Sequence, residues 1–195
     1  VPRVDHPEPE PEPDPEPDPD PEPRTTPSRV VSSCADAAVY RTCLDREFVQ
    51  KEIGWQEQYK RPIITVFEEE QRRQAHFDYG KAWAKYGGTP YERLLNVDSI
   101  TYRRDMDEAE AMINRIVRKA TAKRPSRSAN CLNHPGSWDF FLSHGQAAAG
   151  DQVKMLCFLL RQRGKTVWYD NEMTDCSTEA MEEGVKHSAH FLLFL

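Results

Sequence analysis

The chain has 195 residues, enough for one domain with tails, and a formal charge of −6. Residues 1–27 alone carry −7, from nine acidic residues and two arginines. The remainder is nearly neutral and gives no electrostatic reason to expect nucleic acid as a partner. Five scattered cysteines without a CxxC pair favour a reducing compartment over a disulfide scaffold or metal site. No segment is apolar for long enough to cross a bilayer. We therefore expect a cytoplasmic protein.

Residues 7–23 alternate proline with Glu or Asp without interruption. Proline fixes φ and removes the backbone N–H donor, so neither helix nor sheet is expected there. At about 3.1 Å per residue the segment would form a polyproline II rod of roughly 50 Å. We therefore interpret residues 1–27 as a disordered acidic spacer, with a ligand for a proline-binding domain as the alternative.

Residues 44–60 predict an amphipathic helix with one carboxylate on its apolar side. Glu52 falls within the apolar half of the helical wheel, one turn after Phe48. A carboxylate on an inward face is costly unless it is paired, hydrogen-bonded or lining a cleft. The alternative is a glutamate at the edge of the buried stripe, reaching water or a nearby arginine. The residues that share the apolar half are Leu44, Phe48, Val49, Ile53, Trp55 and Tyr59.

Strand and helix patterns alternate along the rest of the chain. The predicted strands are the apolar runs 61–67, 97–102, 138–143, 166–169 and 191–195. The predicted helices cover 76–86, a segment from Asp105 or Asp107 to Ala120, 151–163 and 177–188. A linker at 120–136 and a polar loop at 170–176 complete the pattern. Alternation without hairpin signals predicts a parallel α/β sheet covered on both faces.

Three other signals carry no assignment. Gly145 and Gly150 have the glycine spacing of a phosphate loop, but Asp151-Gln152 stands where Lys and Ser/Thr are required. His187 and His190 are three residues apart, yet the second belongs to a predicted strand and no third ligand is near, so we expect no metal site. The adjacency of Ser143 and His144 does not make a catalytic pair, because such partners meet through the fold.

Three stretches resemble Toll/interleukin-1 receptor (TIR) domains. WDFFLSHG at 138–145 resembles the family's opening strand and loop, and GKTVWYD at 164–170 resembles its second box. FVQKEI at 48–53, followed by RPIITVF at 61–67, resembles its third helix and fourth strand. The resemblance covers roughly residues 44–119 and 137–195. It implies a flavodoxin-like three-layer sandwich with a five-stranded parallel sheet.

The two halves of the resemblance stand in permuted order. Residues 28–119 resemble the C-terminal half of a TIR domain, from third helix to fifth helix, and 137–195 resemble the N-terminal half, from first to third strand. The domain is either circularly permuted or cut from a tandem array. Because the strand that is central in the family's sheet comes last, we expect the cut array or an incomplete gene model. In either case we expect one sheet, with 191–195 beside 138–143.

The resemblance implies an enzyme. Many TIR domains cleave NAD⁺ into nicotinamide and ADP-ribose, and their essential glutamate follows an aromatic residue by four positions, as Glu52 follows Phe48; the common motif has Trp there. A partly desolvated carboxylate stabilises the oxocarbenium-like ribose. We expect a raised pKa for Glu52, with the group still mostly ionised at neutral pH. NAD⁺ is then the substrate, with no cofactor.

The resemblance also implies substrate-binding positions, which are Phe48, Ser143, His144, Gly145, Trp168 and Asp170. The loop Ser143-His144-Gly145 at the end of the predicted strand 138–143 would face the phosphates, and Trp168 would stack on a base. An arginine often follows the family's first box. His144-Gly145-Gln146 stands here instead, which leaves the phosphates without their expected partner.

A second class of function is a non-enzymatic adaptor for signalling in innate immunity. Other TIR domains act by assembling with one another, so the partners would be further TIR domains rather than nucleic acid or membrane. The interaction loop would comprise Asn171, Glu172, Met173, Thr174, Asp175, Cys176 and Ser177. An adaptor has no need of an inward-facing carboxylate, so Glu52 separates the two hypotheses. A decaying fragment with neither activity is the third.

Overall fold

The computed structural model describes residues 40–128 and 130–195, and the expected acidic spacer at 1–27 lies outside the described residues. A five-stranded sheet has the order β2-β1-β5-β3-β4, and every neighbouring pair is parallel. The strands are β1 (Ile63–Phe67), β2 (Ile100–Thr101), β3 (Trp138–His144), β4 (Val167–Trp168) and β5 (Ser188–Phe194).

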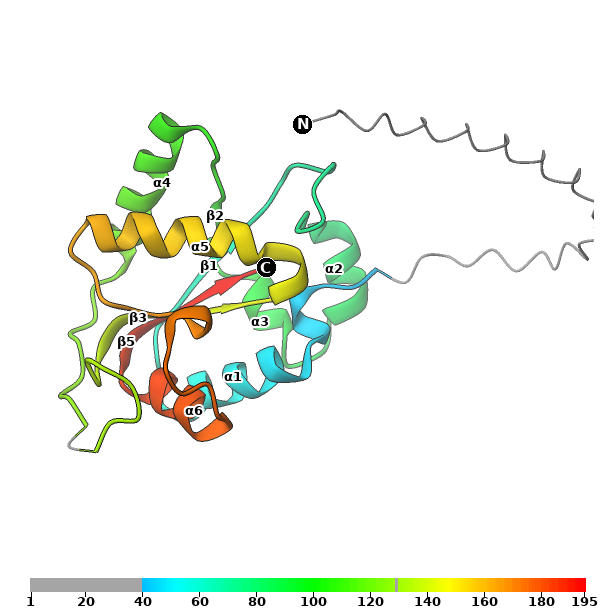
Figure 1. The fold of residues 1–195 in the computed structure, drawn as a ribbon. Coiled ribbons are helices and arrows are strands. Elements are labelled where there is room, and N and C mark those ends of the chain that lie inside the picture. The colour runs from blue at the N-terminus through cyan, green and yellow to red at the C-terminus, as the bar shows by residue number, and fades with distance from the viewer. Residues whose placement is uncertain (1–39, 129) are drawn as a thin grey trace, which may run out of the picture. The chain divides into compact units, whose positions relative to one another are not determined.

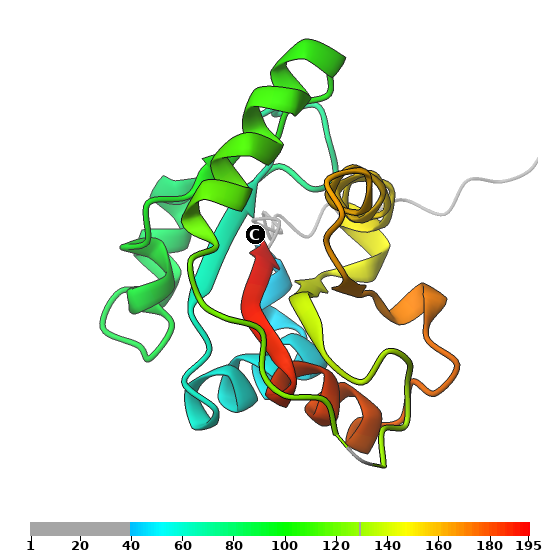
Figure 2. The same cartoon turned by 90° about the vertical axis from the view of Figure 1, so that its left-hand side faces the viewer.

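Helices cover both faces of this sheet (Figures 1 and 2). One apolar cluster packs α4 (Met106–Lys119) and α5 (Gln146–Gln162) against one face. A second cluster packs the remaining helices against the other face. These are α1 (Glu47–Gln58), α2 (Tyr79–Tyr86), α3 (Glu92–Leu95) and α6 (Thr178–Lys186). The chain therefore has the predicted α/β, flavodoxin-like three-layer fold.

The central strand joins the two parts of the chain. On one side of β5, Phe191 is in register with Ile63 of β1, and on the other side Ser188 is in register with Trp138 of β3. The prediction that strands from both sides of residues 120–136 share one sheet, with the last strand beside 138–143, is confirmed. Counted from β3 and continued through β1, the strand order is 2-1-3-4-5, which is that of flavodoxin-like sheets.

The connection between α4 and β3 is held against the amino ends of the strands. The Ala122 N–H donates to Nε2 of His190 at 3.0 Å, and the Leu132 N–H donates to the Glu183 carboxylate at 3.0 Å. Asn133 exchanges two hydrogen bonds with the backbone of Asp175, at 2.7 and 3.0 Å. The carboxyl ends of the strands lie at the opposite edge of the sheet.

The largest error in the predicted elements concerns α5. The helix begins at Gln146 rather than Asp151, so the glycine-bounded segment 145–150 forms helical turns and not a loop. Its three alanines are strong helix formers, and a Cβ on Gly150 would meet nothing within 4 Å. Among the residues that the structure describes, no helix combines the length and the apolar character that crossing a membrane requires.

Candidate functional site

A cavity of about 510 Å³ lies at the carboxyl end of β3, between the first turns of α1 and of α5. Open α/β sheets bind ligands at this edge. Its lining includes Glu52, Asp170, His144, Gly145 and Arg46. The structure thus brings together Glu52 and the loop after β3, which are far apart in the sequence.

Glu52 is buried, with an exposed fraction of 8 %. Ser143 Oγ donates a hydrogen bond to its Oε2 at 2.6 Å. Side chains alternate along a strand, so Ser143 follows Phe141 on the face of β3 that packs against α1. No cation pairs with Glu52 among the described residues, which separates it from the alternative of a glutamate paired with an arginine.

The environment of Glu52 favours its protonated form. Burial raises the pKa from 4.5 to about 8, the Ser143 hydrogen bond opposes the rise, and the negative charge of Asp170 adds to it. The direction is the predicted one. The expectation that the group is mostly ionised at neutral pH is wrong for the unliganded protein, because burial without a neighbouring cation outweighs the single hydrogen bond.

His144 ends β3 and is also buried, with an exposed fraction of 8 %. Its Nε2 has no hydrogen-bond partner among the residues that the structure describes. Burial lowers its pKa and the charge of Asp170 partly restores it, so the imidazole is neutral at pH 7. Gly145 then caps α5 without any side-chain acceptor, which leaves the first N–H groups of that helix without partners inside the helix.

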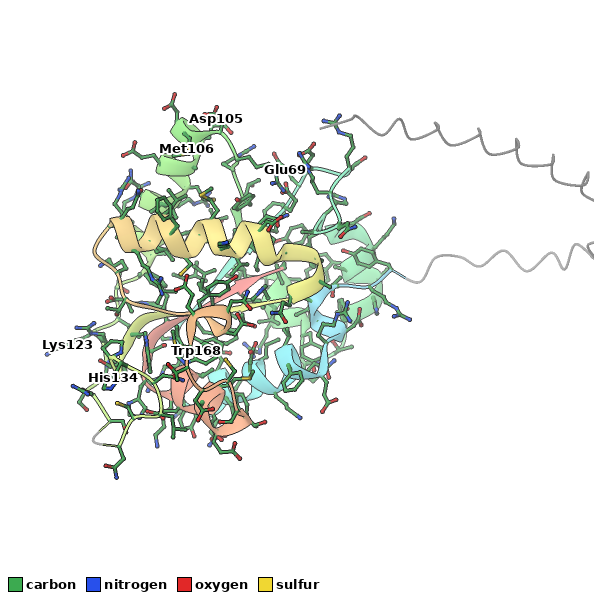
Figure 3. The ribbon with its side chains drawn as sticks, viewed as in Figure 1. Glu69, Asp105, Met106, Lys123, His134 and Trp168 are labelled. Carbon is green, nitrogen blue, oxygen red and sulfur yellow. The ribbon has the colours of Figure 1, made fainter. Side chains whose placement is uncertain are left out.

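Two aromatic residues do not lie where the sequence placed them. Phe48 was expected on the inward face, yet it is 54 % exposed in the first turn of α1, where its ring meets the Lys51 ammonium at 5.2 Å and lines the cavity. Trp168 is 1 % exposed and stacks on Phe141 with ring centroids 4.5 Å apart. Figure 3 labels it in the interior.

The expectation that Trp168 stacks on a bound base is therefore wrong. Its indole packs against α6 at Gly184, where an added Cβ would lie 2.7 Å from the indole nitrogen. The ring belongs to the apolar cluster that also contains Phe141 of β3 and Val185 of α6. Its contribution is to the core beneath the site.

The expected interaction loop 171–177 follows Asp170 and is largely exposed. Asp170–Glu172 forms a short 3-10 turn, and Ser177 caps α6 by accepting from the Ala180 N–H. Gln146 of α5 donates to the Asn171 side chain at 2.9 Å. Of this region, Asp170 is the residue that lines the cavity with Glu52, while most residues after it are exposed and Met173 packs against the second apolar cluster.

Arg46 was missed as a site residue. It is the residue before α1, with extended backbone, and it lines the cavity six positions ahead of Glu52. The signal that could have found it is a basic residue at the start of the helix that carries the candidate carboxylate. Within the described part of the chain, His, Cys, Asp and Glu side chains form no group of three or more that could hold a metal ion.

Comparisons with known proteins do not place the chain in a family: no protein-family model, curated protein or solved structure matches it. The fold has the strand order of flavodoxin-like proteins, which host many unrelated activities. A function must therefore be argued from the geometry and chemistry of the cavity.

Proposed function

We propose that the protein is a TIR-type NAD⁺ glycohydrolase in which Glu52 is the catalytic carboxylate. The observation that carries the proposal is the burial of Glu52, hydrogen-bonded to Ser143, in the wall of a cavity at the carboxyl edge of the sheet. A buried, unpaired carboxylate is costly for folding, and such groups gather at functional sites. The permuted TIR pattern in the sequence supplies the identity of the reaction.

The reaction breaks the bond between C1′ of the ribose and the nicotinamide nitrogen. The electron pair of that bond leaves with nicotinamide, which becomes neutral, and the ribose becomes an oxocarbenium-like cation. Water adds to this cation and loses a proton, giving ADP-ribose. An ionised Glu52 beside the cation lowers the barrier, because a charge fixed in a site of low dielectric stabilises an opposite charge strongly.

The raised pKa of Glu52 is compatible with this role. The nicotinamide ring of NAD⁺ is cationic, and an opposite charge within a few ångströms lowers the pKa of a carboxyl. Substrate binding would therefore ionise Glu52 and release a proton near neutral pH. Ser143 would hold the carboxylate in place through the same hydrogen bond that it donates in the free protein.

The test is nicotinamide release from NAD⁺ by the purified full chain and three variants. Glu52→Gln keeps the shape of the side chain without its charge and should reduce kcat at least about 100-fold, as loss of an electrostatic stabiliser does. Ser143→Ala should lower kcat less. Glu47→Gln removes an exposed carboxylate of the same helix, paired only with Lys51, and should leave the rate unchanged. Equal rates for wild type and Glu52→Gln would end the enzyme proposal.

The second candidate is an adaptor that signals by self-association with other TIR domains in the cytoplasm. It is favoured by the exposure of residues 171–177 beside a well-anchored Asn133–Asp175 pair. Light scattering across a concentration series would measure assembly. The adaptor proposal predicts that changing both Glu172 and Thr174 to Ala abolishes assembly, whereas Glu52→Gln preserves it. These results, in a protein that leaves NAD⁺ intact, would establish the adaptor and rule out the enzyme.

A further inference from the structure

The cavity that holds Glu52 is lined by both acidic and basic side chains. Glu52 and Asp170 carry the carboxyl groups of its wall, and Arg46 is the arginine that lines it within the described residues. The side chain of Arg46 forms no ion pair or hydrogen bond with the described part of the chain. By contrast, Arg93 and Arg104 are engaged by Glu57 and Glu68 at 2.7 Å.

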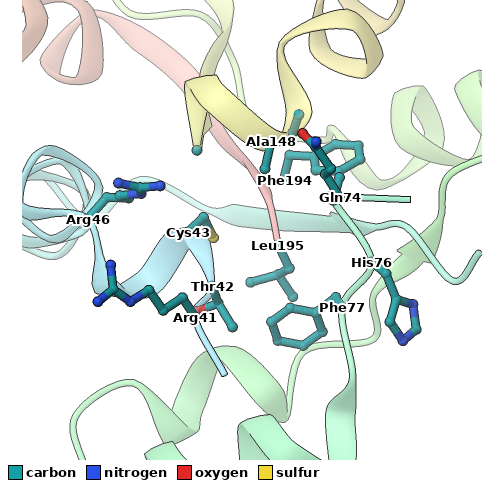
Figure 4. Close-up of a pocket in the computed structure, with 13 residues that line it drawn as sticks. Arg41, Thr42, Cys43, Arg46, Gln74, His76, Phe77, Ala148, Phe194 and Leu195 are labelled. Atoms are coloured by element: carbon teal, nitrogen blue, oxygen red, sulfur yellow. The ribbon is translucent and has the colours of Figure 1, made fainter. Parts of the chain in front are cut away.

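Arg46 stands at the junction of two cavities. A smaller one of about 60 Å³ adjoins the first, and both are lined by Arg46 and Gly145. Figure 4 shows Arg41 and Arg46 on the same side of this smaller cavity, next to Cys43. The smaller cavity extends the basic surface, because Arg41 lines it beside Arg46.

Gly145, at the start of α5, lines the same cavity as Arg46. A Cβ added to Gly145 would make ordinary van der Waals contact with Cys43, 3.4 Å from its Cβ, so the two segments lie side by side. The 17-residue helix α5 begins there with N–H groups that no side chain caps. Such a terminus attracts anions. Beside it, the buried His144 lines the cavity with an unpartnered Nε2.

These observations point to an anion between Arg46 and the first turn of α5. We propose that Arg46 binds the diphosphate of the dinucleotide substrate, together with the N–H groups at the start of α5 and His144. The inference rests on the proposed function for the identity of the ligand. The arginine that often follows the first TIR box is absent here, so the phosphates lack their expected partner. The inference gives this role to Arg46, which lies in another segment of the chain.

The substrate then matches the cavity in charge along its length. Its cationic nicotinamide lies toward Glu52 and Asp170, and its anionic diphosphate lies toward Arg46. A guanidinium binds phosphate oxygens through two parallel N–H bonds, which fixes orientation as well as affinity. Arg46 is thereby a positioning and specificity residue, since it meets the part of the substrate that does not react.

The test compares NAD⁺ with nicotinamide riboside, which has the same scissile bond and no phosphate. Arg46→Gln should raise KM for NAD⁺ at least about 10-fold, the usual cost of losing a hydrogen bond to a charged group, and change kcat less than about threefold. It should leave kcat/KM for nicotinamide riboside unchanged. Arg46→Lys should recover part of the affinity for NAD⁺. Arg41→Gln is the matched control, because it removes an equal charge from a nearby arginine that does not line the cavity of Glu52.

Binding of ADP-ribose, measured by calorimetry, separates this inference from the proposed function because it requires no cleavage. Weaker binding by Arg46→Gln than by Arg41→Gln, in a protein that does not cleave NAD⁺, would support the phosphate site and overturn the enzyme. Cleavage of NAD⁺ with equal KM values in wild type and Arg46→Gln would overturn the phosphate site alone. A folded wild type that neither binds ADP-ribose nor cleaves NAD⁺ would overturn both. An unchanged thermal midpoint confirms that each variant is folded.

Discussion

Replacing Glu52 with Gln should stabilise the protein, and the gain should grow with pH. In the folded protein burial raises the pKa of Glu52 from 4.5 to about 8. Between these values the unfolded chain has lost the proton that the folded chain retains, so the free energy of unfolding falls as pH rises. The loss is about 1.4 kcal/mol for each pH unit. It should begin near pH 4.5 and end near pH 8.

The size of the effect follows from these two pKa values. At pH 7 the cost is about 3 kcal/mol, and at pH 5 it is under about 1 kcal/mol. Glutamine does not titrate, and its amide oxygen can still accept from Ser143, so Glu52→Gln removes most of this cost. For a domain of this size the gain at pH 7 corresponds to a rise of roughly 6–12 °C in the thermal midpoint.

Urea denaturation at pH 5, 6, 7 and 8, followed by tryptophan fluorescence, would measure the difference between wild type and Glu52→Gln. Taking the difference largely removes the titration of groups that both proteins share. Glu47→Gln, an exposed site, controls for the general effect of removing a charge. If the wild-type and Glu52→Gln curves stay parallel from pH 5 to 8, the argument from burial is wrong.

Two further predictions concern parts of the fold away from the cavity. Burial lowers the pKa of His190, whose neutral ring accepts from the Ala122 N–H. The free energy of unfolding should therefore be highest above pH 6.5, the pKa of histidine in the unfolded chain, and should fall as the pH drops below it. In acid denaturation, His190→Gln should flatten this dependence. Gly184→Ala should destabilise the protein by about 1–3 kcal/mol through its clash with Trp168. Gly150→Ala meets open space and should stabilise α5 by about 0.5–1 kcal/mol. Equal thermal midpoints for the two variants would contradict this prediction.

The layered fold follows from local patterns that the sequence carries openly. Apolar runs alternate with amphipathic segments, and alternation without hairpins leaves a parallel sheet as the consistent solution. One helix cap could also be read directly: Asp105 accepts from helix N–H groups as expected of such a residue. Asp151, where another helix was expected to begin, lies inside α5. The position of Glu52 followed from helical periodicity, since Val49 and Ile53 on either side of it are buried.

The remaining features depend on contacts between distant segments. Phe48 belongs to the apolar arc of the wheel, yet in the fold it lines the cavity wall and its ring is exposed. Trp168 is amphipathic in principle, and only the missing side chain of Gly184 draws it into the core. Arg46 lines the cavity together with Gly145 at the start of α5, and no local pattern reveals that these distant segments meet there.

The central claim is tested most directly by incubating the full chain with NAD⁺ at high protein concentration and following the reaction by NMR. The account predicts that nicotinamide and ADP-ribose appear in equal amounts with wild type, and that Glu52→Gln yields neither above the spontaneous rate. Intact NAD⁺ in the presence of folded wild-type protein, under crowded conditions that promote assembly, would contradict it.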